Sequence, residues 1–188
     1  MKTILIWGSW RMLKKPYPLT ILACLILFGL AEMAGAILGG YPQQVKEIAT
    51  GIIQSHPSEH GLIGVKDIDM VIIDKTSTEV FARLHTFHLH GHGLGIVVFI
   101  ISLIIINLDT SDRYKKTLTI LLSMGLIYPF GWLFFTILIP YLGKQTAFHL
   151  AEKIFFVPFG GIFFLAICGT ILFALMDTIR SFRKEKTS

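Results

Sequence analysis

Four long apolar stretches constrain this chain more than any other feature of its sequence. They cover residues 19–40, 83–108, 118–142 and 154–176. Each approaches or exceeds the roughly 20 residues that a helix needs to cross the hydrocarbon core of a bilayer. A composition that is 53% hydrophobic and only 15% charged is also typical of a membrane protein. We therefore predict an all-α integral membrane protein, a bundle of four transmembrane helices that forms a single domain over residues 1–188.

The positions of lysine and arginine predict how this bundle is oriented. Eleven of them lie in residues 1–18, 109–116 and 177–188, and six lie in residues 41–83 and 143–153. Because positively charged loops stay on the cytoplasmic side, both termini are expected there, in a bacterial-type inner or plasma membrane. This topology accounts for the net charge of +5, so we predict the lipid bilayer as a partner and no nucleic acid.

Residues 41–80 form the one sizeable loop, which this topology places on the outer side. The apolar spacing of Val45–Gln54 predicts a short amphipathic helix, and the alternation in Val65–Asp74 favours an extended segment. A loop of about 40 residues is too small for a well-buried core, so we expect it to cover the bundle or to contact a partner. Pro129 predicts a kink in the third helix, and Pro158–Gly161 a distortion or close approach in the fourth.

Four of the seven histidines lie within eight residues at the start of the second apolar stretch: His85, His88, His90 and His92. Since successive helical residues turn by about 100°, the side chains of His85, His88 and His92 should share one face, with His90 well away from it. Ionisable side chains inside a bilayer usually face the bundle interior and mark a functional site. This stretch is therefore the predicted site.

Other helices carry possible partners at matching depth. Glu32 of the first helix should be level with His92, while His149 and Glu152, which open the fourth, should be level with His85 and His88. Glu32 is interpreted as a protonated structural residue, a metal ligand, a partner for a histidine N–H or a proton-relay group. Arg83 is either an interfacial anchor or a partner for a haem propionate.

Three glycines follow the histidines, and a second histidine motif lies in the outer loop. Gly91, Gly93 and Gly95 leave room either for another helix or for a flat macrocycle. His56-Pro-Ser-Glu-His60 matches the H-x-x-E-H string of inverted zinc peptidases, but that chemistry needs both imidazoles on one long helix. A solvated loop is the favoured interpretation, and an accessory metal contact from His56 or His60 is the alternative. Without a Cys-x-x-Cys pair, covalent c-type haem attachment is excluded.

These residues leave four functions open. The favoured one is a b-type cytochrome-like protein that binds haem b near the outer face and exchanges electrons with a quinol or a redox partner. His88, His92, His149 and Arg83 are its predicted cofactor-binding residues. The second is a copper, zinc or non-haem iron protein, catalytic or metal-delivering, with His85, His88, His92, His149 and Glu32 as ligands. The others are an oligomeric proton or metal transporter and a small subunit of a larger membrane complex.

Overall fold

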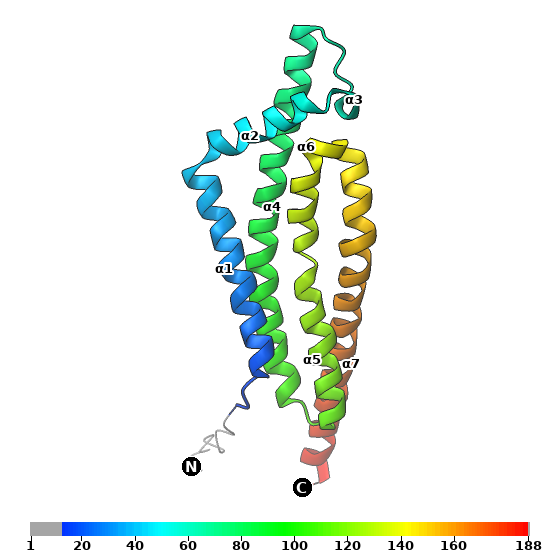
Figure 1. The fold of residues 1–188 in the computed structure, drawn as a ribbon. Helices are drawn as coiled ribbons and strands as arrows, with labels where there is room; N and C mark the ends of the chain where they lie inside the picture. Colours follow the sequence, from blue (N-terminus) through cyan, green and yellow to red (C-terminus); the bar gives the residue numbers. More distant parts are fainter. Residues whose placement is uncertain (1–12, 188) are drawn as a thin grey trace, which may run out of the picture.

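The structure is a computed structural model that describes residues 13–187, and within that range every regular element is a helix. The start of the basic N-terminal segment, with Lys2 and Arg11, lies outside the described residues. Long helical segments run side by side as a bundle, with the first and last described residues at the same end (Figure 1). These segments are α1 (Pro18–Gly40), α4 (Lys66–Asn107), α5 (Asp112–Met124) continued by α6 (Phe130–Ala151), and α7 (Val157–Thr187).

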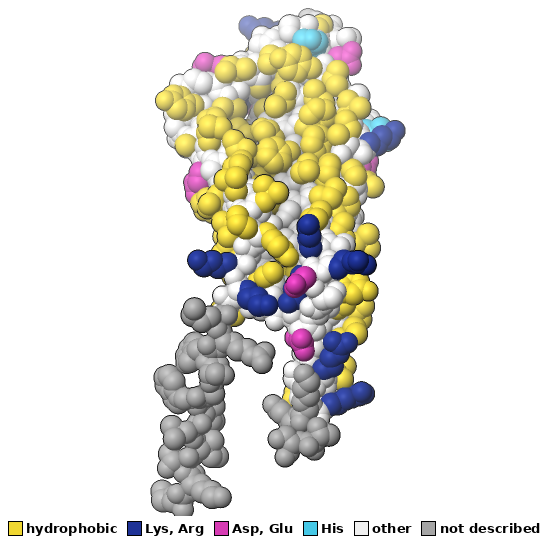
Figure 2. Space-filling model, turned by 60° about the horizontal axis from the view of Figure 1, so that its bottom comes forward, with side chains coloured by type: hydrophobic (Ala, Val, Ile, Leu, Met, Phe, Trp, Pro, Cys, Tyr) yellow, Lys and Arg dark blue, Asp and Glu magenta, His cyan; other side chains and the backbone are white. Residues whose placement is uncertain are grey.

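Three helical stretches are long and apolar enough to cross a membrane: Pro18–Gly40, Lys66–Asn107 and Asp112–Arg183. The third has 72 residues because helix continues almost unbroken through a reversal of the chain, so that it folds back on itself (Figure 1). Hydrophobic side chains cover the flank of the bundle, and Lys and Arg side chains gather at the end where the described chain begins and ends (Figure 2). The bundle is therefore compatible with contact with a lipid bilayer, as predicted.

The contact between α1 and α4 is close because small residues face each other. A Cβ atom built on Gly91 would lie 2.7 Å from the Cβ atom of Ala31, and one on Gly95 would lie 3.6 Å from the carbonyl oxygen of Cys24. Fully buried side chains such as Leu27 and Val98 fill the interface around these glycines. Close backbone approach through small residues is a general means of helix association in membranes. Gly91 and Gly95 therefore serve helix packing.

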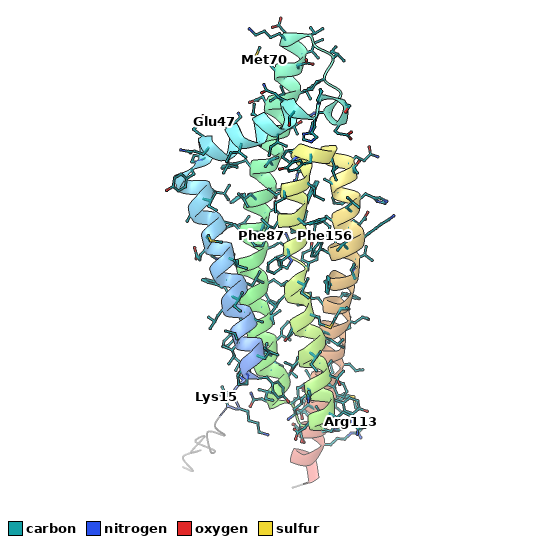
Figure 3. The ribbon with its side chains drawn as sticks, viewed as in Figure 1. Lys15, Glu47, Met70, Phe87, Arg113 and Phe156 are labelled. Atoms are coloured by element: carbon teal, nitrogen blue, oxygen red, sulfur yellow. The ribbon has the colours of Figure 1, made fainter. Side chains whose placement is uncertain are left out.

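The predicted distortion near Pro129 is confirmed. The α-helix of α5 ends at Met124, a short 3-10 helix covers Gly125–Ile127, and α6 begins at Phe130. Pro129 directly precedes the first residue of α6, and proline is common where a helix begins. The aromatic rings of Phe87 and Phe156 lie inside the bundle near this level, while Lys15 and Arg113 lie at its lower end (Figure 3).

The last long helix of the bundle begins earlier than predicted. Gly143 has φ 71° and ψ 162°, which ends the first part of α6 and reverses the chain. The helical segment after Gly143 packs against the segment before it, and the ring centroids of Phe135 and Phe148 are 5.5 Å apart. The returning helix thus starts at residue 144 instead of 154, continues through a π-helix at Glu152–Phe156, and becomes α7. Polar residues such as Lys144 and Gln145 conceal this start in the hydropathy pattern.

The predicted outer loop is almost entirely helical. The amphipathic helix is confirmed as α2 (Pro42–Ser55), which lies across the end of the bundle, followed by the short α3 (Pro57–His60) (Figure 1). The extended segment predicted at Val65–Asp74 is wrong, because α4 already begins at Lys66. Acidic residues in its first turn favour helix through the helix dipole, and the carboxylate of Asp69 accepts bonds from the N–H groups of Ile63 and Gly64.

We expect Gly91→Leu to destabilise the bundle, whereas Gly93→Leu should have little effect. Extra methylene groups in a tightly packed interface cost about 1–3 kcal/mol, and a Cβ atom on Gly91 already meets Ala31. A Cβ atom on Gly93 meets nothing within 4 Å, and both changes alter helix propensity equally. Thermal unfolding midpoints in detergent measure the difference. Equal midpoints for the two variants would contradict the packing role of Gly91.

Candidate functional site

The histidines of α4 are divided between two faces, as the helical spacing predicts. The rings of His85 and His88 are stacked with centroids 6.2 Å apart, and those of His88 and His92 meet edge to face at 4.5 Å. His90 lies on the other side of the helix, where its ring stacks on Trp132 at 5.6 Å. The predicted stripe of His85, His88 and His92 is confirmed: His88 and His92 contact α1, and His85 is exposed beside His88.

His88 is fixed against the backbone of α1. Its Nδ1 atom lies 2.8 Å from the carbonyl oxygen of Ala31, and because a carbonyl only accepts, Nδ1 carries the proton and donates. The ring also lies over Gly35, where a built Cβ atom would be 2.6 Å from the imidazole Cε1. Gly35 is therefore part of the site. Its position four residues after Ala31 is the one sequence signal that could have identified it.

His92 and Glu32 form the polar end of the site. The Nε2 atom of His92 lies 3.5 Å from a carboxylate oxygen of Glu32, which confirms that the two residues are level. That nitrogen is itself buried and has no hydrogen bond among the described residues. The two side chains are therefore neighbours that do not form a hydrogen bond with each other. The Glu32 side chain is 57% exposed, and the ring of Phe28 packs 4.5 Å from the imidazole. The Nε2 atom of His92 is thus a hydrogen-bonding position that the protein leaves unused.

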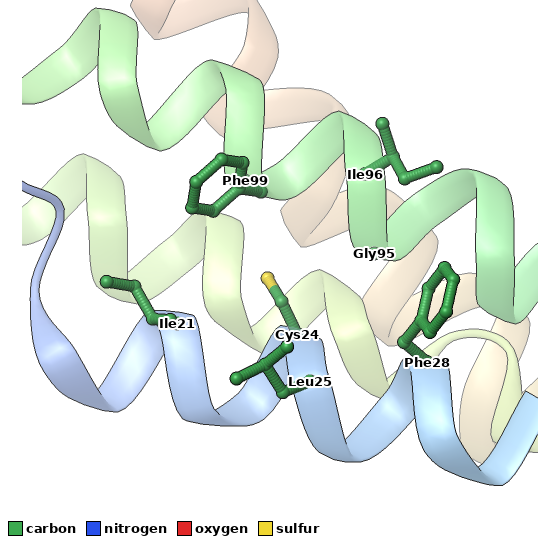
Figure 4. A pocket seen from close by; sticks show the side chains of 7 residues that line it. All are labelled: Ile21, Cys24, Leu25, Phe28, Gly95, Ile96 and Phe99. Carbon is green, nitrogen blue, oxygen red and sulfur yellow. The ribbon is translucent and has the colours of Figure 1, made fainter.

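An apolar groove of about 210 Å³ continues from this pair along the α1–α4 interface. Phe28 and Gly95 lie at its near end, one helical turn from Glu32 and His92, and Ile21 and Phe99 lie farther along it (Figure 4). Gly95 contributes no side chain there, so the groove reaches the backbone of α4. Leu25 is 63% exposed on its rim, and the groove opens sideways to the surroundings of the bundle.

The structure does not bring His149 to the histidine stripe. Its side chain is 61% exposed, and its Nδ1 atom lies 3.6 Å from Glu152, three residues away on the same helix. Ala147 and Ala151, on either side of it in sequence, are the residues of this turn that are buried in the bundle. His149 therefore points outward, while His88 contacts α1.

Arg83 is engaged with protein groups above the histidines. Its guanidinium lies 2.6 Å from the carboxylate of Glu79, which also pairs with Lys144 at 3.0 Å, and it covers the ring of Trp132 at 5.7 Å. These contacts join α4 to the reversal between α6 and α7. They fit an interfacial anchor, and the propionate role of Arg83 stays a prediction.

The two histidines of the H-x-x-E-H string point to different partners. The Nε2 atom of His60 donates to the carbonyl oxygen of Pro140 over 2.8 Å, and Nδ1 of His56 is 2.9 Å from the carbonyl oxygen of Ile52. The backbone of Glu59 lies close to Gly143: a Cβ atom on Gly143 would be 2.6 Å from the carbonyl oxygen of Glu59. This short segment thus holds α2 and α3 on the chain reversal at Gly143.

Within residues 13–187, no group of three or more His, Cys, Asp or Glu side chains is placed to hold a metal ion. The copper, zinc and non-haem iron prediction therefore gains no support from the geometry. The chain matches no known protein-family model, no curated protein and no solved structure. The site must be interpreted from its own residues.

Replacing Gly35 by alanine should displace the His88 ring and break its bond to Ala31. A Cβ atom at this position would overlap the imidazole, and the ring has to move because the backbone of α1 cannot. Imidazole ¹⁵N chemical shifts of histidine-labelled protein report whether Nδ1 keeps its bonded proton. Gly39→Ala is the matched control, one turn away with nothing within 4 Å. Identical His88 signals in both variants would refute the contact.

Proposed function

We propose that this chain is a membrane protein of four passes with both termini on the cytoplasmic side. The passes are α1, residues 83–107 of α4, α5 with α6, and residues 144–176. Two observations support this topology: the chain reversal at Gly143, and the basic side chains gathered at the end where the described chain begins and ends (Figure 2). A helix of 42 residues is about 63 Å long, so the start of α4 projects beyond the bilayer on the outer side.

We propose that its function is to bind a membrane quinol between α1 and α4 and to take part in its oxidation. The proposal rests on the His92–Glu32 pair, 3.5 Å apart, which lies one helical turn from the near end of an apolar groove on the flank of the bundle. A quinol has the matching chemistry, since its hydroxyl groups donate hydrogen bonds and its ring and tail are apolar. Ionisable side chains in membrane-spanning helices, such as this carboxylate and imidazole, usually mark a functional site.

The residues present account for the protons of this reaction. Oxidation of a quinol breaks two O–H bonds and releases two protons and two electrons. His92 Nε2, unbonded in the structure, accepts one proton, and the Glu32 carboxylate accepts the other. His88, whose Nδ1–H is held by Ala31, positions His92 through ring contact. The two electrons would need an acceptor that takes them one at a time, and a haem in this chain or in a partner protein of a larger membrane complex would supply that chemistry.

A haem held by His88 and His149 requires both imidazoles at one porphyrin, and these side chains point in different directions. Among the described residues, α1 already contacts the His88 ring through Ala31 and Gly35, which leaves no room for a macrocycle on that side of the ring. The quinol site does not depend on which protein carries the haem. We therefore propose haem as the class of acceptor, without assigning its ligands.

Quinol binding should depend on both members of the polar pair. Hydrogen bonds to charged groups contribute about 1.5–3 kcal/mol, so Glu32→Gln and His92→Leu should each weaken binding about tenfold or more. Isothermal titration of decylubiquinol, and separately of a short-chain menaquinol, into the protein in nanodiscs measures the dissociation constants. Leu25→Trp, which fills the apolar groove, should abolish binding while leaving the polar pair intact.

His149→Ala is the control for this experiment, because it removes an exposed histidine away from the groove. It should bind both quinols as the unmodified protein does. Equal affinity in the Glu32→Gln and His92→Leu variants and the unmodified protein, or no binding of either quinol by the folded unmodified protein, would exclude the proposed site. A preference for one quinol would identify the ring class.

A visible absorption spectrum tests whether the haem belongs to this chain. If it does, the purified protein should show a Soret band and sharp reduced α and β bands. If His149 is one of the haem ligands, His149→Ala should abolish the low-spin spectrum. An unchanged spectrum would exclude His149 as a ligand. The absence of these bands from protein expressed with an ample supply of haem would exclude haem from this chain.

A further inference from the structure

A second groove lies between α1 and α5, at the opposite end of the bundle from α2 and α3. Its volume is about 460 Å³, more than twice that of the groove beside His92. Apolar side chains form its length, including Leu19, Ile120 and Ile127, which are 77%, 51% and 37% exposed. An exposed apolar channel along a membrane-facing flank fits an acyl chain.

Three threonine and serine residues line the same groove, and the hydroxyl group of one of them has no hydrogen-bond partner among the described residues. The hydroxyl groups of Thr20 and Ser123 bond to each other over 3.0 Å across the two helices. Thr119 lines the groove as well, and its hydroxyl oxygen is buried and has no hydrogen-bond partner among the described residues. Thr119 is only 3% exposed. A buried hydroxyl without a partner is unfavourable, so this atom indicates a ligand with hydrogen-bonding groups.

A positively charged residue, Lys116, lies at one end of the groove. Lys116 and Tyr17 line it, and Lys15 precedes Tyr17 by two residues at the lower end of the bundle (Figure 3). Lys and Arg side chains are concentrated at this end of the molecule (Figure 2). Lys115, in contrast, is buried and donates to the carbonyl oxygen of Ile106 at the end of α4. Lys116 is therefore the lysine of α5 that faces a ligand in the groove.

We propose that the α1–α5 groove binds a phospholipid with a net negative headgroup. The phosphate lies beside Lys116, an ester or glycerol oxygen accepts a hydrogen bond from the hydroxyl group of Thr119, and an acyl chain follows the apolar length of the groove. Basic pockets between membrane helices on the cytoplasmic side are a recurring form of lipid recognition. The lipid would hold α1 against α5, a contact that the protein itself makes through few residues such as Thr20 and Ser123.

Native mass spectrometry of the full chain tests this proposal. The delipidated protein is mixed with equal amounts of phosphatidylglycerol and phosphatidylcholine, and inorganic phosphate is added in a separate arm. We expect retention of phosphatidylglycerol over phosphatidylcholine and none of phosphate alone. Because each lysine near a membrane surface contributes to anionic lipid binding, Lys116→Gln should reduce retention about fivefold. Thr119→Val, similar in volume, should also reduce it, but for both lipids.

The matched control is Lys66→Gln, which removes a lysine at the far end of the bundle, where α4 begins. It should retain phosphatidylglycerol as the unmodified protein does. Equal retention of the two lipids by the unmodified protein would overturn the proposal, as would equal losses in Lys116→Gln and Lys66→Gln, which indicate general annular lipid. Retention of free phosphate would replace the lipid by an anion site. None of these outcomes depends on the quinol site.

Discussion

The close approach of α1 to α4 is the constraint on which the rest of the structure depends. Ala31 fills the space left by Gly91, and its carbonyl oxygen accepts a hydrogen bond from His88. A larger residue at Gly91 would separate the helices, and the histidine stripe would then face lipid without a partner. The same contact brings Glu32 level with His92 and leaves Gly95 as the floor of the apolar groove. The helix-packing contacts and the candidate site therefore belong to the same α1–α4 interface.

Polar groups inside this bundle are mostly satisfied locally, which makes the exceptions informative. The hydroxyl groups of Ser102, Thr136 and Thr170 donate to carbonyl oxygens three or four residues earlier in their own helices. His92 Nε2, Thr119 Oγ1 and Trp132 Nε1 are buried and have no such partner among the described residues. Thr119 lines the α1–α5 groove, and His92 lies one helical turn from the α1–α4 groove. Two of the three unsatisfied atoms thus lie at or near a groove proposed as a ligand site.

The site on α4 is largely predictable from the sequence because it depends on helical geometry alone. A rotation of about 100° per residue places His85, His88 and His92 on one face whatever they contact, and the rise per residue predicts that His92 is level with Glu32. His149 shows the limit of that reasoning. The hydropathy pattern places the start of its helix at residue 154, whereas the returning helix starts at residue 144 and turns the side chain outward.

The sequence by itself determined the helical class, the apolar stretches and the stripe of histidines, because hydropathy and a fixed helical period act locally. Only the tertiary structure decided where α4 begins, where the chain reverses and which helix the stripe faces. Those outcomes depend on contacts between residues distant in sequence, such as Glu59 with Gly143 and His60 with Pro140. The free energy of such contacts is set by neighbours that no local pattern identifies. Gly35 became part of the site only when packing placed it beneath His88.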